Sequence, residues 1–224
     1  MPRLRQVPRS EVTDPIVSSM YDLVFGKDVD PLEQGTATGS EGDWWTVYAL
    51  VPDVMEHAVQ GFVLYRSPDR HLDPVLRELA LTRAGWAGGS TFVYSQHCKA
   101  LRGLGVTSDK IRAIDSWPVS SEFSDVERAV LGYVDAIVLD KGRCSDDLFA
   151  ALKGHLSDET ILELTYITAM YQMHASVTRA LRLEWDDLDE PVHEVENPED
   201  FDAEHYVSVG AEQDSKAQLR SIRS

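Results

Sequence analysis

The hydrophobic positions of this chain recur every three or four residues over most of its length, which is the spacing of amphipathic helices. No segment is convincing as a β-strand. The sequence therefore predicts an all-α protein. The expected helices lie at about residues 15–24, 44–51, 54–65, 72–86, 91–102, 108–116, 125–139, 146–153 and 158–183.

Several of these helices have recognisable ends. Ser124 followed by Glu127 fits a capping box at the start of one helix. Gly103 ends the helix at 91–102, and Gly85, Gly88 and Gly89 separate this helix by a short turn from the helix at 72–86. A turn this short requires the two helices to pack against each other.

Three parts are expected along the chain. Residues 1–42 hold a short helix and a long loop, because residues 26–41 mix Gly, Pro and polar residues without a period. Residues 43–188 form the helical domain. Residues 189–224 form an acidic, extended tail.

The acidic residues are concentrated near the C-terminus. Residues 184–214 contain thirteen Asp or Glu and no Lys or Arg. Such a run favours a solvated tail. The alternative is a tail that packs across a neighbouring subunit through Trp185, Phe201 and Tyr206.

Charge and composition exclude several classes of function. The formal net charge is −17 and no basic stripe is present, so nucleic acid is not an expected partner. The N-terminus lacks an apolar signal region and no apolar run is long enough to cross a membrane, so we expect a cytoplasmic protein. Cys98 and Cys144 are expected to be free thiols. No metal-site spacing, phosphate loop or dinucleotide fingerprint occurs, so neither a metal nor a cofactor is expected.

A histidine is predicted to point into the interior. On a helical wheel, His97 falls in one apolar arc with Val93, Ala100 and Leu101. A buried imidazole needs a polar partner, because an unpaired buried polar group costs about 1 to 3 kcal/mol. Glu78, at the edge of the apolar arc of the preceding helix, can meet it. A carboxylate beside an imidazole makes a general base; the alternative is a structural pair in the core.

The spacing of these residues resembles a known family. Glu78, the Gly89–Ser90 turn, His97 and the Gly103–Ile111 segment resemble the core motif of the carboxymuconolactone decarboxylase and alkylhydroperoxidase D-like (AhpD-like) proteins. The resemblance extends over about residues 43–188. It implies a multi-helix bundle that assembles as a homo-oligomer, a trimer, hexamer or dimer, with sites near subunit interfaces.

The peroxidase branch of that family carries two cysteines where this chain has Ser90 and Val93. Thiol peroxidase chemistry needs a low-pKa cysteine and a resolving partner, so this activity is not expected. Cys98 points about 100° away from His97 on the helix and is not an expected substitute. The decarboxylase branch often has Tyr-Glu-Trp where this chain has Phe92-Val93-Tyr94, so its lactone substrate does not carry over directly.

These residues predict a cofactor-independent lyase, decarboxylase-like, or an isomerase that acts on a small organic acid or lactone. His97 would move a proton beside a carbonyl, Glu78 would orient it, and Ser90 and Tyr94 would bind the oxyanion. Trp86 and Gln172 are further candidates for substrate contact.

Two other functions remain open. One is a catalytically silent ligand-binding or assembly protein on the same scaffold. The other is a hydrolase in which His97 activates Ser90, although Ser90 is better placed as a helix cap.

The last long helix contributes two further expectations. His174 lies on an apolar arc and is expected in the core or at an interface. The opposite stripe is expected to be solvated; its members are Thr165, Thr168, Gln172, Ser176 and Arg179.

Overall fold

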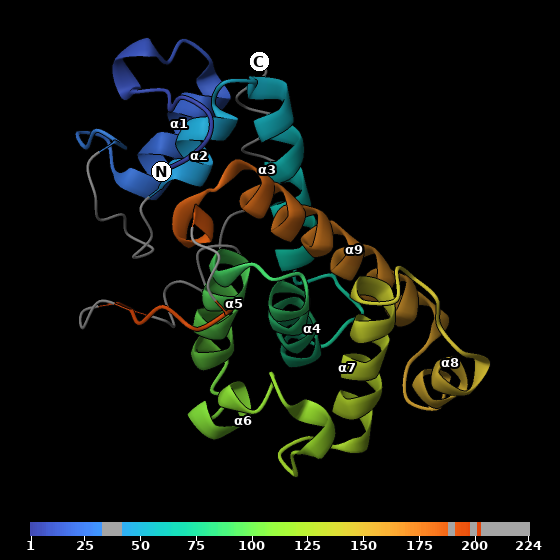
Figure 1. The fold of residues 1–224 in the computed structure, drawn as a ribbon. Coiled ribbons are helices and arrows are strands. Elements are labelled where there is room, and N and C mark those ends of the chain that lie inside the picture. The colour runs from blue at the N-terminus through green and yellow to red at the C-terminus, as the bar shows by residue number, and fades with distance from the viewer. Residues whose placement is uncertain (33–41, 188–190, 198–200, 203–224) are drawn as a thin grey trace.

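The computed structural model describes residues 1–32, 42–187, 191–197 and 201–202 (Figure 1). Within these ranges the regular structure is entirely helical, which confirms the predicted all-α class. Three short 3-10 segments, η1 (Arg9–Glu11), η2 (Trp117–Val119) and η3 (Glu184–Asp187), accompany the α-helices. The α-helices are α1 (Pro15–Phe25), α2 (Asp43–Tyr48), α3 (Pro52–Arg66), α4 (Pro74–Ala87), α5 (Thr91–Gly103), α6 (Ser108–Arg112), α7 (Asp125–Val138), α8 (Asp146–Lys153) and α9 (Asp158–Leu181).

Side-chain caps explain where most helices begin. Asp73 accepts hydrogen bonds from the backbone N–H groups of Val75 and Leu76 at the start of α4. Ser124 and Glu127 form the predicted capping box at the start of α7. The largest difference from the sequence-based helices is α6, which ends at Arg112 rather than Ser116, because the next residues form tighter i to i+3 turns.

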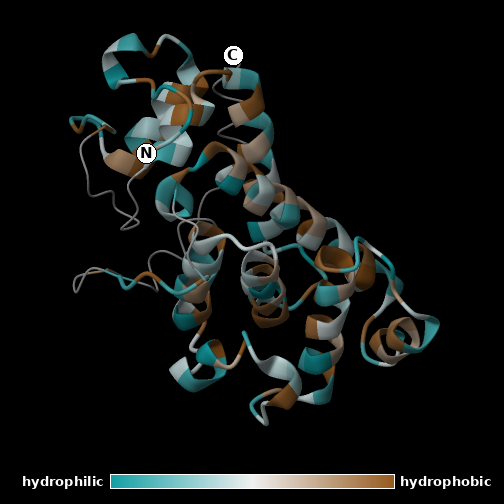
Figure 2. Ribbon diagram, in the orientation of Figure 1, coloured by the Kyte–Doolittle hydropathy of each residue, from teal (hydrophilic) through white to brown (hydrophobic). Residues whose placement is uncertain are grey.

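The helices α4 and α5 form the centre of the molecule (Figure 1). Helices α7 and α9 pack against α4, and α8 lies against α7 and α9. The main apolar core lies between α4, α7 and α9 and includes Leu81, Val134 and Leu164. Most helices carry hydrophobic and hydrophilic residues on different sides (Figure 2).

The N-terminal residues are attached to the rest of the protein at two places. Tyr21 of α1 packs with Met55 and Val59 of α3 in a second apolar cluster. The backbone N–H of Arg3 donates to the carbonyl of Leu181 at the end of α9 (2.8 Å). The expected boundary near residue 42 therefore does not separate α1 from the packing of the helical domain.

The helices α4 and α5 approach each other closely at Gly85. A Cβ atom placed there would lie 2.6 Å from the backbone nitrogen of Tyr94 and 2.8 Å from Cγ1 of Val93. Both contacts are shorter than real Cβ contacts, so a side chain larger than hydrogen would push the helices apart.

Gly85→Ala is expected to destabilise the fold by about 2 kcal/mol, because overpacking outweighs the higher helix propensity of Ala. Urea denaturation measures the loss. Gly132→Ala in α7 is the matched control, since its Cβ would meet side-chain atoms alone, of Leu148 at 3.3 Å and of Trp117 at 3.5 Å. Equal stability of Gly85→Ala and the parent would contradict the close approach.

Candidate functional site

The central feature is a hydrogen-bonded pair between α4 and α5. Nδ1 of His97 lies 2.6 Å from Oε2 of Glu78. Both residues are buried, with 4% and 3% of their surface exposed. Nε2 of His97 makes no hydrogen bond within the described ranges. The structure therefore brings together the two residues that the sequence analysis named as a pair.

An arginine supports the carboxylate from the other side. Nε of Arg77 donates to Oε1 of Glu78 (2.9 Å), and Nη1 of Arg77 donates to the carbonyl of Tyr65 (3.0 Å). Burial alone would raise the pKa of Glu78. The neighbouring His97 and Arg77 outweigh it, and the pKa lies below its ordinary value. Glu78 is thus held as a carboxylate between two nitrogen donors.

Two tyrosines border the imidazole. The ring of Tyr171 on α9 stands edge-on to His97 with centroids 4.5 Å apart, and Tyr65 lies at 6.2 Å. Burial, and next the neighbouring Tyr65, raise the pKa of Tyr171 well above its usual range, so Tyr171 keeps its proton. Sequence reasoning missed Tyr65 and Arg77, because neither shares a helical arc with His97 or Glu78.

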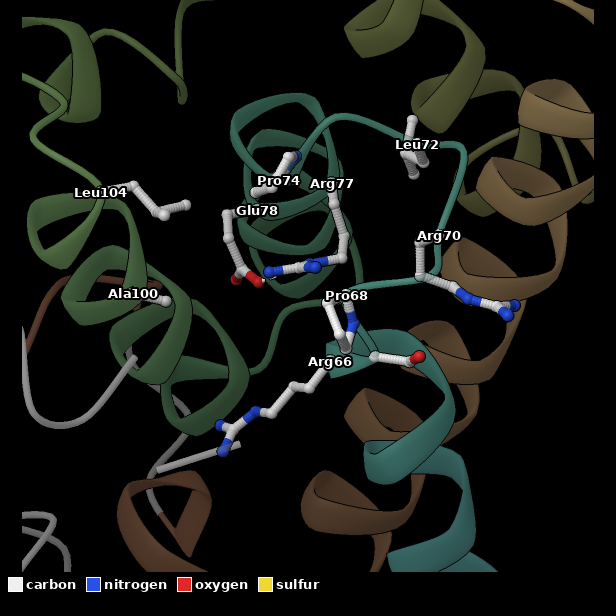
Figure 3. Close-up of a pocket in the computed structure, with 10 residues that line it drawn as sticks. Arg66, Pro68, Arg70, Leu72, Pro74, Arg77, Glu78, Ala100 and Leu104 are labelled. Carbon is white, nitrogen blue, oxygen red and sulfur yellow. Dashed lines mark hydrogen bonds and ion pairs between the residues drawn. The ribbon is translucent and has the colours of Figure 1, made fainter. Parts of the chain in front are cut away.

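Glu78 also borders a pocket between α4, α5 and the segment that joins α3 to α4 (Figure 3). Its volume is about 250 Å³. Arg77 and Glu78 point toward one another at its centre, whereas Arg70 points away toward α9 (Figure 3). The lining consists of Arg66, Ser67, Pro68, Arg70, Leu72, Pro74, Arg77, Glu78, Ala100 and Leu104. His97 is not among these lining residues, and it contacts Glu78, which is.

Ser90 occupies the start of α5 rather than this pocket. Its hydroxyl accepts from the backbone N–H of Val93 (3.1 Å) and donates to Oδ2 of Asp186 (2.6 Å). Thr178 lies 3.0 Å from the same hydroxyl. Ser90 is thus a helix cap, and its hydrogen bonds go to groups other than His97. The Ser90–His97 hydrolase therefore lacks the nucleophile-to-base contact that it requires.

The other candidate substrate contacts also lie outside the pocket. Tyr94 packs in a third apolar cluster with Leu79 and Cys98. Trp86 is at the same cluster and lies under the guanidinium of Arg83, 4.3 Å from its ring. Gln172 is a partly exposed residue of α9. The structure does not gather these three side chains around Glu78.

The two thiols are not placed for redox chemistry. Cys98 is fully buried, and burial raises its pKa well above the usual range. Burial and the neighbouring Asp146 raise the pKa of Cys144 as well. Val93 is an apolar core residue. The protonated thiols and the apolar Val93 fit the expectation that thiol peroxidase chemistry is absent.

The described part of the acidic C-terminal segment is not simply solvated, in contrast to the favoured expectation. Val195 N–H donates to the hydroxyl of Ser95 on α5 (2.9 Å), and the guanidinium of Arg102 pairs with Glu194. Residues 191–197 therefore lie along α5 of the same chain because its polar and basic side chains supply partners. The Lys99 ammonium lies over the ring of Phe201, and Tyr206 lies outside the described residues.

His174 is buried, as the sequence predicted, among aromatic rings. Its ring lies 5.3 Å from Phe62, 5.4 Å from Tyr171 and 6.0 Å from Trp44. Nε2 is buried without a hydrogen-bond partner among the residues that are described. Burial, and next the nearby His97 and His57, lower the pKa of His174 to about 4. His174 is therefore neutral at pH 7.

This shift makes stability depend on pH. The unfolded state binds a proton at His174 below about pH 6.5, whereas the folded state does so only below about pH 4. Stability is therefore lost as pH falls through this window, by ~2 kcal/mol at pH 5 from this group. Urea denaturation at pH 7.5 and 5.0 should show a smaller loss for His174→Phe than for the parent. If the parent and His174→Phe lost the same stability between pH 7.5 and 5.0, His174 would not be buried in its neutral form.

The polar stripe predicted on α9 is only partly solvated. Thr168 is fully buried, and the Thr165 hydroxyl lies 2.8 Å from that of Tyr133. Leu162, Tyr166 and Met173 are exposed instead. Helix α9 buries the face that carries Thr165 and Thr168 because α4 and α7 pack against that face.

Two searches of the described residues gave negative results. No group of three or more His, Cys, Asp or Glu side chains is arranged to hold a metal ion. No described helix combines the length and hydropathy needed to cross a membrane.

The helical arrangement is that of the AhpD-like fold, as a solved structure of an alkylhydroperoxidase AhpD core shows (TM-score 0.56, 16% identical, over 75% of this chain and 80% of that one). Residues 51–136 match the carboxymuconolactone decarboxylase family. The similarity to this family covers α3 through most of α7.

Three relatives show how far the similarity extends. The uncharacterized protein YnjA of Escherichia coli is 27% identical over 143 residues, 62% of this chain and 74% of YnjA. A protein of unknown function from Agrobacterium tumefaciens is 25% identical with a TM-score of 0.55, over 61% of this chain and 92% of its own. The debrominase Bmp8 in complex with 2,3,4-tribromopyrrole is 15% identical with a TM-score of 0.58, and the match covers 99% of this chain and 100% of the Bmp8 chain. This last similarity concerns the fold alone.

Proposed function

We propose that this protein is a lyase or isomerase that moves a proton at a carbon next to a carbonyl group of a small organic acid or lactone, without a cofactor. The observation that carries the proposal is the buried 2.6 Å contact between Glu78 and His97, with Glu78 on the wall of a pocket. Members of the carboxymuconolactone decarboxylase family are often enzymes. The debrominase Bmp8 has the same fold and is seen in complex with the small molecule 2,3,4-tribromopyrrole.

The pair can hold one proton between Oε2 of Glu78 and Nδ1 of His97. In a decarboxylation, loss of CO2 leaves an electron pair on the enolate carbon, and the proton of the pair completes the product. In an isomerisation, the pair takes a proton from one carbon and returns it to another. Because Glu78 borders the pocket, we assign the exchange with the ligand to Glu78 and the storage of the proton to His97.

A deuterium-exchange screen tests the proposal without a known substrate. Small 2-oxo acids, 3-oxo acids and lactones are incubated with the protein in D2O, and NMR follows exchange or loss of CO2 at the carbon next to the carbonyl. The proposal requires catalysis on at least one compound and its loss in His97→Gln. Catalysis that persists within a few-fold in His97→Gln and in Glu78→Gln would show the pair to be structural.

A second candidate is the catalytically silent ligand-binding protein. It is favoured by the low exposure of His97 and by the distance of Ser90 and Tyr94 from the pocket. The two functions differ in one outcome. A silent protein binds compounds of the same panel, as measured by calorimetry, but shows no deuterium exchange with any of them.

We also propose that the chain forms a homo-oligomer. Its support is the exposed apolar stripe of Leu162, Tyr166 and Met173 on α9. Sedimentation at micromolar concentration tests this assembly, and a monomer would contradict it.

A further inference from the structure

We propose that residues 191–197 form a releasable strap on α5. In the docked state the strap covers the apolar cluster that contains Tyr94 and Cys98, and release of the strap uncovers this cluster. The inference goes beyond the proposed function and does not depend on it, because the strap is held by groups other than Glu78 and His97.

The strap is an extended segment with one side turned to the protein. Residues 191–197 form neither helix nor strand. Exposed and half-buried positions nearly alternate along them, as in an extended chain that lies on a surface. The exposed residues are Pro191, His193 and Glu196, and the half-buried residues are Val192, Glu194, Val195 and Asn197.

The side of α5 that holds the strap is polar and basic. Ser95 and Arg102 are seven residues apart, which is two helical turns, so they share one side of the helix. The Ser95 hydroxyl accepts from the N–H of Val195 (2.9 Å) and donates to the carbonyl of His193 (3.4 Å). The guanidinium of Arg102 binds both carboxylate oxygens of Glu194, with Nη2 2.7 Å from Oε2. The strap is thus held by its backbone and by one acidic side chain.

Lys99 lies between these two residues on the same side of α5. Its ammonium lies 5.1 Å from the ring centre of Trp185, which precedes the strap, and 5.3 Å from that of Phe201, which follows it. Burial lowers the pKa of Lys99 to about 8, and the nearby Glu194 opposes this shift. An acidic segment therefore faces two cations of α5, and salt screens this attraction.

An apolar stripe of α5 runs beside the polar side. Tyr94, Cys98 and Leu101 each come one residue before a member of the polar side, and all three belong to the third apolar cluster. Val192 of the strap packs against this cluster. Burial, and next the nearby Glu194, raise the pKa of Cys98 above its usual range. The docked strap therefore closes the cluster on the side of the Cys98 thiol.

The strap is held more weakly than the helices. Its ion pair is partly solvated, since the side chains of Arg102 and Glu194 are 30% and 22% exposed. Oδ1 of Asn197 is buried without a hydrogen-bond partner among the residues that are described, which disfavours the docked state. A segment with few buried contacts opens locally while the rest of the protein stays folded. High salt, or loss of the ion pair, therefore favours the open strap.

The rate at which iodoacetamide labels Cys98, followed by mass spectrometry, measures the opening. Cys144 is half-buried and serves as the internal reference. Arg102→Gln and Glu194→Gln should each raise the Cys98 rate about tenfold, because each removes the bidentate pair. Raising NaCl from about 50 to about 500 mM should raise the parental rate as well.

The two charge variants separate opening of the strap from a change in thiol acidity. The charge of Arg102 lowers the pKa of Cys98 and that of Glu194 raises it. Without opening, Arg102→Gln would slow the labelling and Glu194→Gln would speed it, whereas opening makes both faster. Val195→Pro changes no charge and removes only the N–H that Ser95 accepts, so it should also speed the labelling.

Glu196→Gln is the matched control, because it removes the same charge from an exposed residue of the strap. Its rate should stay within twofold of the parental rate. Opposite effects of the two charge variants, an equal acceleration in Glu196→Gln, or unchanged rates in Glu194→Gln and Val195→Pro would each overturn the strap. So would labelling of Cys98 that rises with urea as steeply as global unfolding does. If circular dichroism shows Arg102→Gln to be unfolded, the two strap variants decide.

Discussion

Replacing His97 with Gln is expected to lower the rate of catalysed deuterium exchange by about 10²- to 10⁴-fold, the usual contribution of a positioned acid or base. Gln can still donate a hydrogen bond to Glu78, but it cannot take up or release a proton. NMR measures the exchange on whichever compound of the panel the parent turns over. The effect should appear in the rate at saturation more than in the concentration that gives half the maximal rate.

The matched control for this variant is His155→Gln, which changes an exposed histidine between α8 and α9. It should exchange deuterium at the parental rate. Glu78→Gln should lower the rate as strongly as His97→Gln, and the double variant should lose little more, because the two residues act as one unit. Strictly additive losses would contradict a shared proton.

The largest expected loss of stability follows from Asp186→Ala, at about 3 kcal/mol. Asp186 is buried and accepts hydrogen bonds from the N–H groups of Thr91 (2.6 Å) and Phe92 (3.3 Å) and from the hydroxyl of Ser90. Its removal leaves three donors at the start of α5 without their acceptor. It also removes a negative charge from the positive end of the helix. Urea denaturation at pH 7.5 measures the change.

Asp187→Ala is the control for Asp186→Ala, since it removes the adjacent carboxylate, which pairs with the exposed amino group of Met1. Its loss should stay below about 1 kcal/mol, as for other surface pairs. The loss of stability of Asp186→Asn should fall between those of the two Ala variants, because the amide oxygen of Asn still accepts hydrogen bonds. Similar losses for Asp186→Ala and Asp187→Ala would show that the cap contributes little.

Asp186 is a buried helix cap that the pattern of charges along the sequence does not predict. It and Glu184 belong to the acidic run at residues 184–214, whose composition indicates a solvated tail. In the structure both are buried in η3 and bind helix starts: Glu184 accepts from Trp44 N–H of α2 (2.9 Å), and Asp186 accepts from α5. Composition cannot distinguish a cap from a tail when the capped helix lies about 90 to 140 residues away.

The sequence by itself determined the helical class, nearly all helix positions and the Glu78–His97 pair. These features depend on local rules: the helical period, side-chain caps, and a turn short enough to place α4 against α5. His97 lies on an apolar arc of its own helix, and Glu78 lies on the one neighbour that the turn allows. The identities of Ser90 and Val93 were sufficient to predict that redox cysteines are absent.

The tertiary structure alone decided which residues surround the pair. Tyr65 and Tyr171 border His97 because α3 and α9 cross the α4–α5 unit, and no local period specifies such crossings. Arg77 lies on α4 beside Glu78, and its second hydrogen bond, to the carbonyl of Tyr65, depends on the same crossing. It also decided that Ser90 bonds to Asp186 and that Tyr94 faces another cluster. Both residues share a helix with His97, but their partners are set by packing between segments far apart in the sequence.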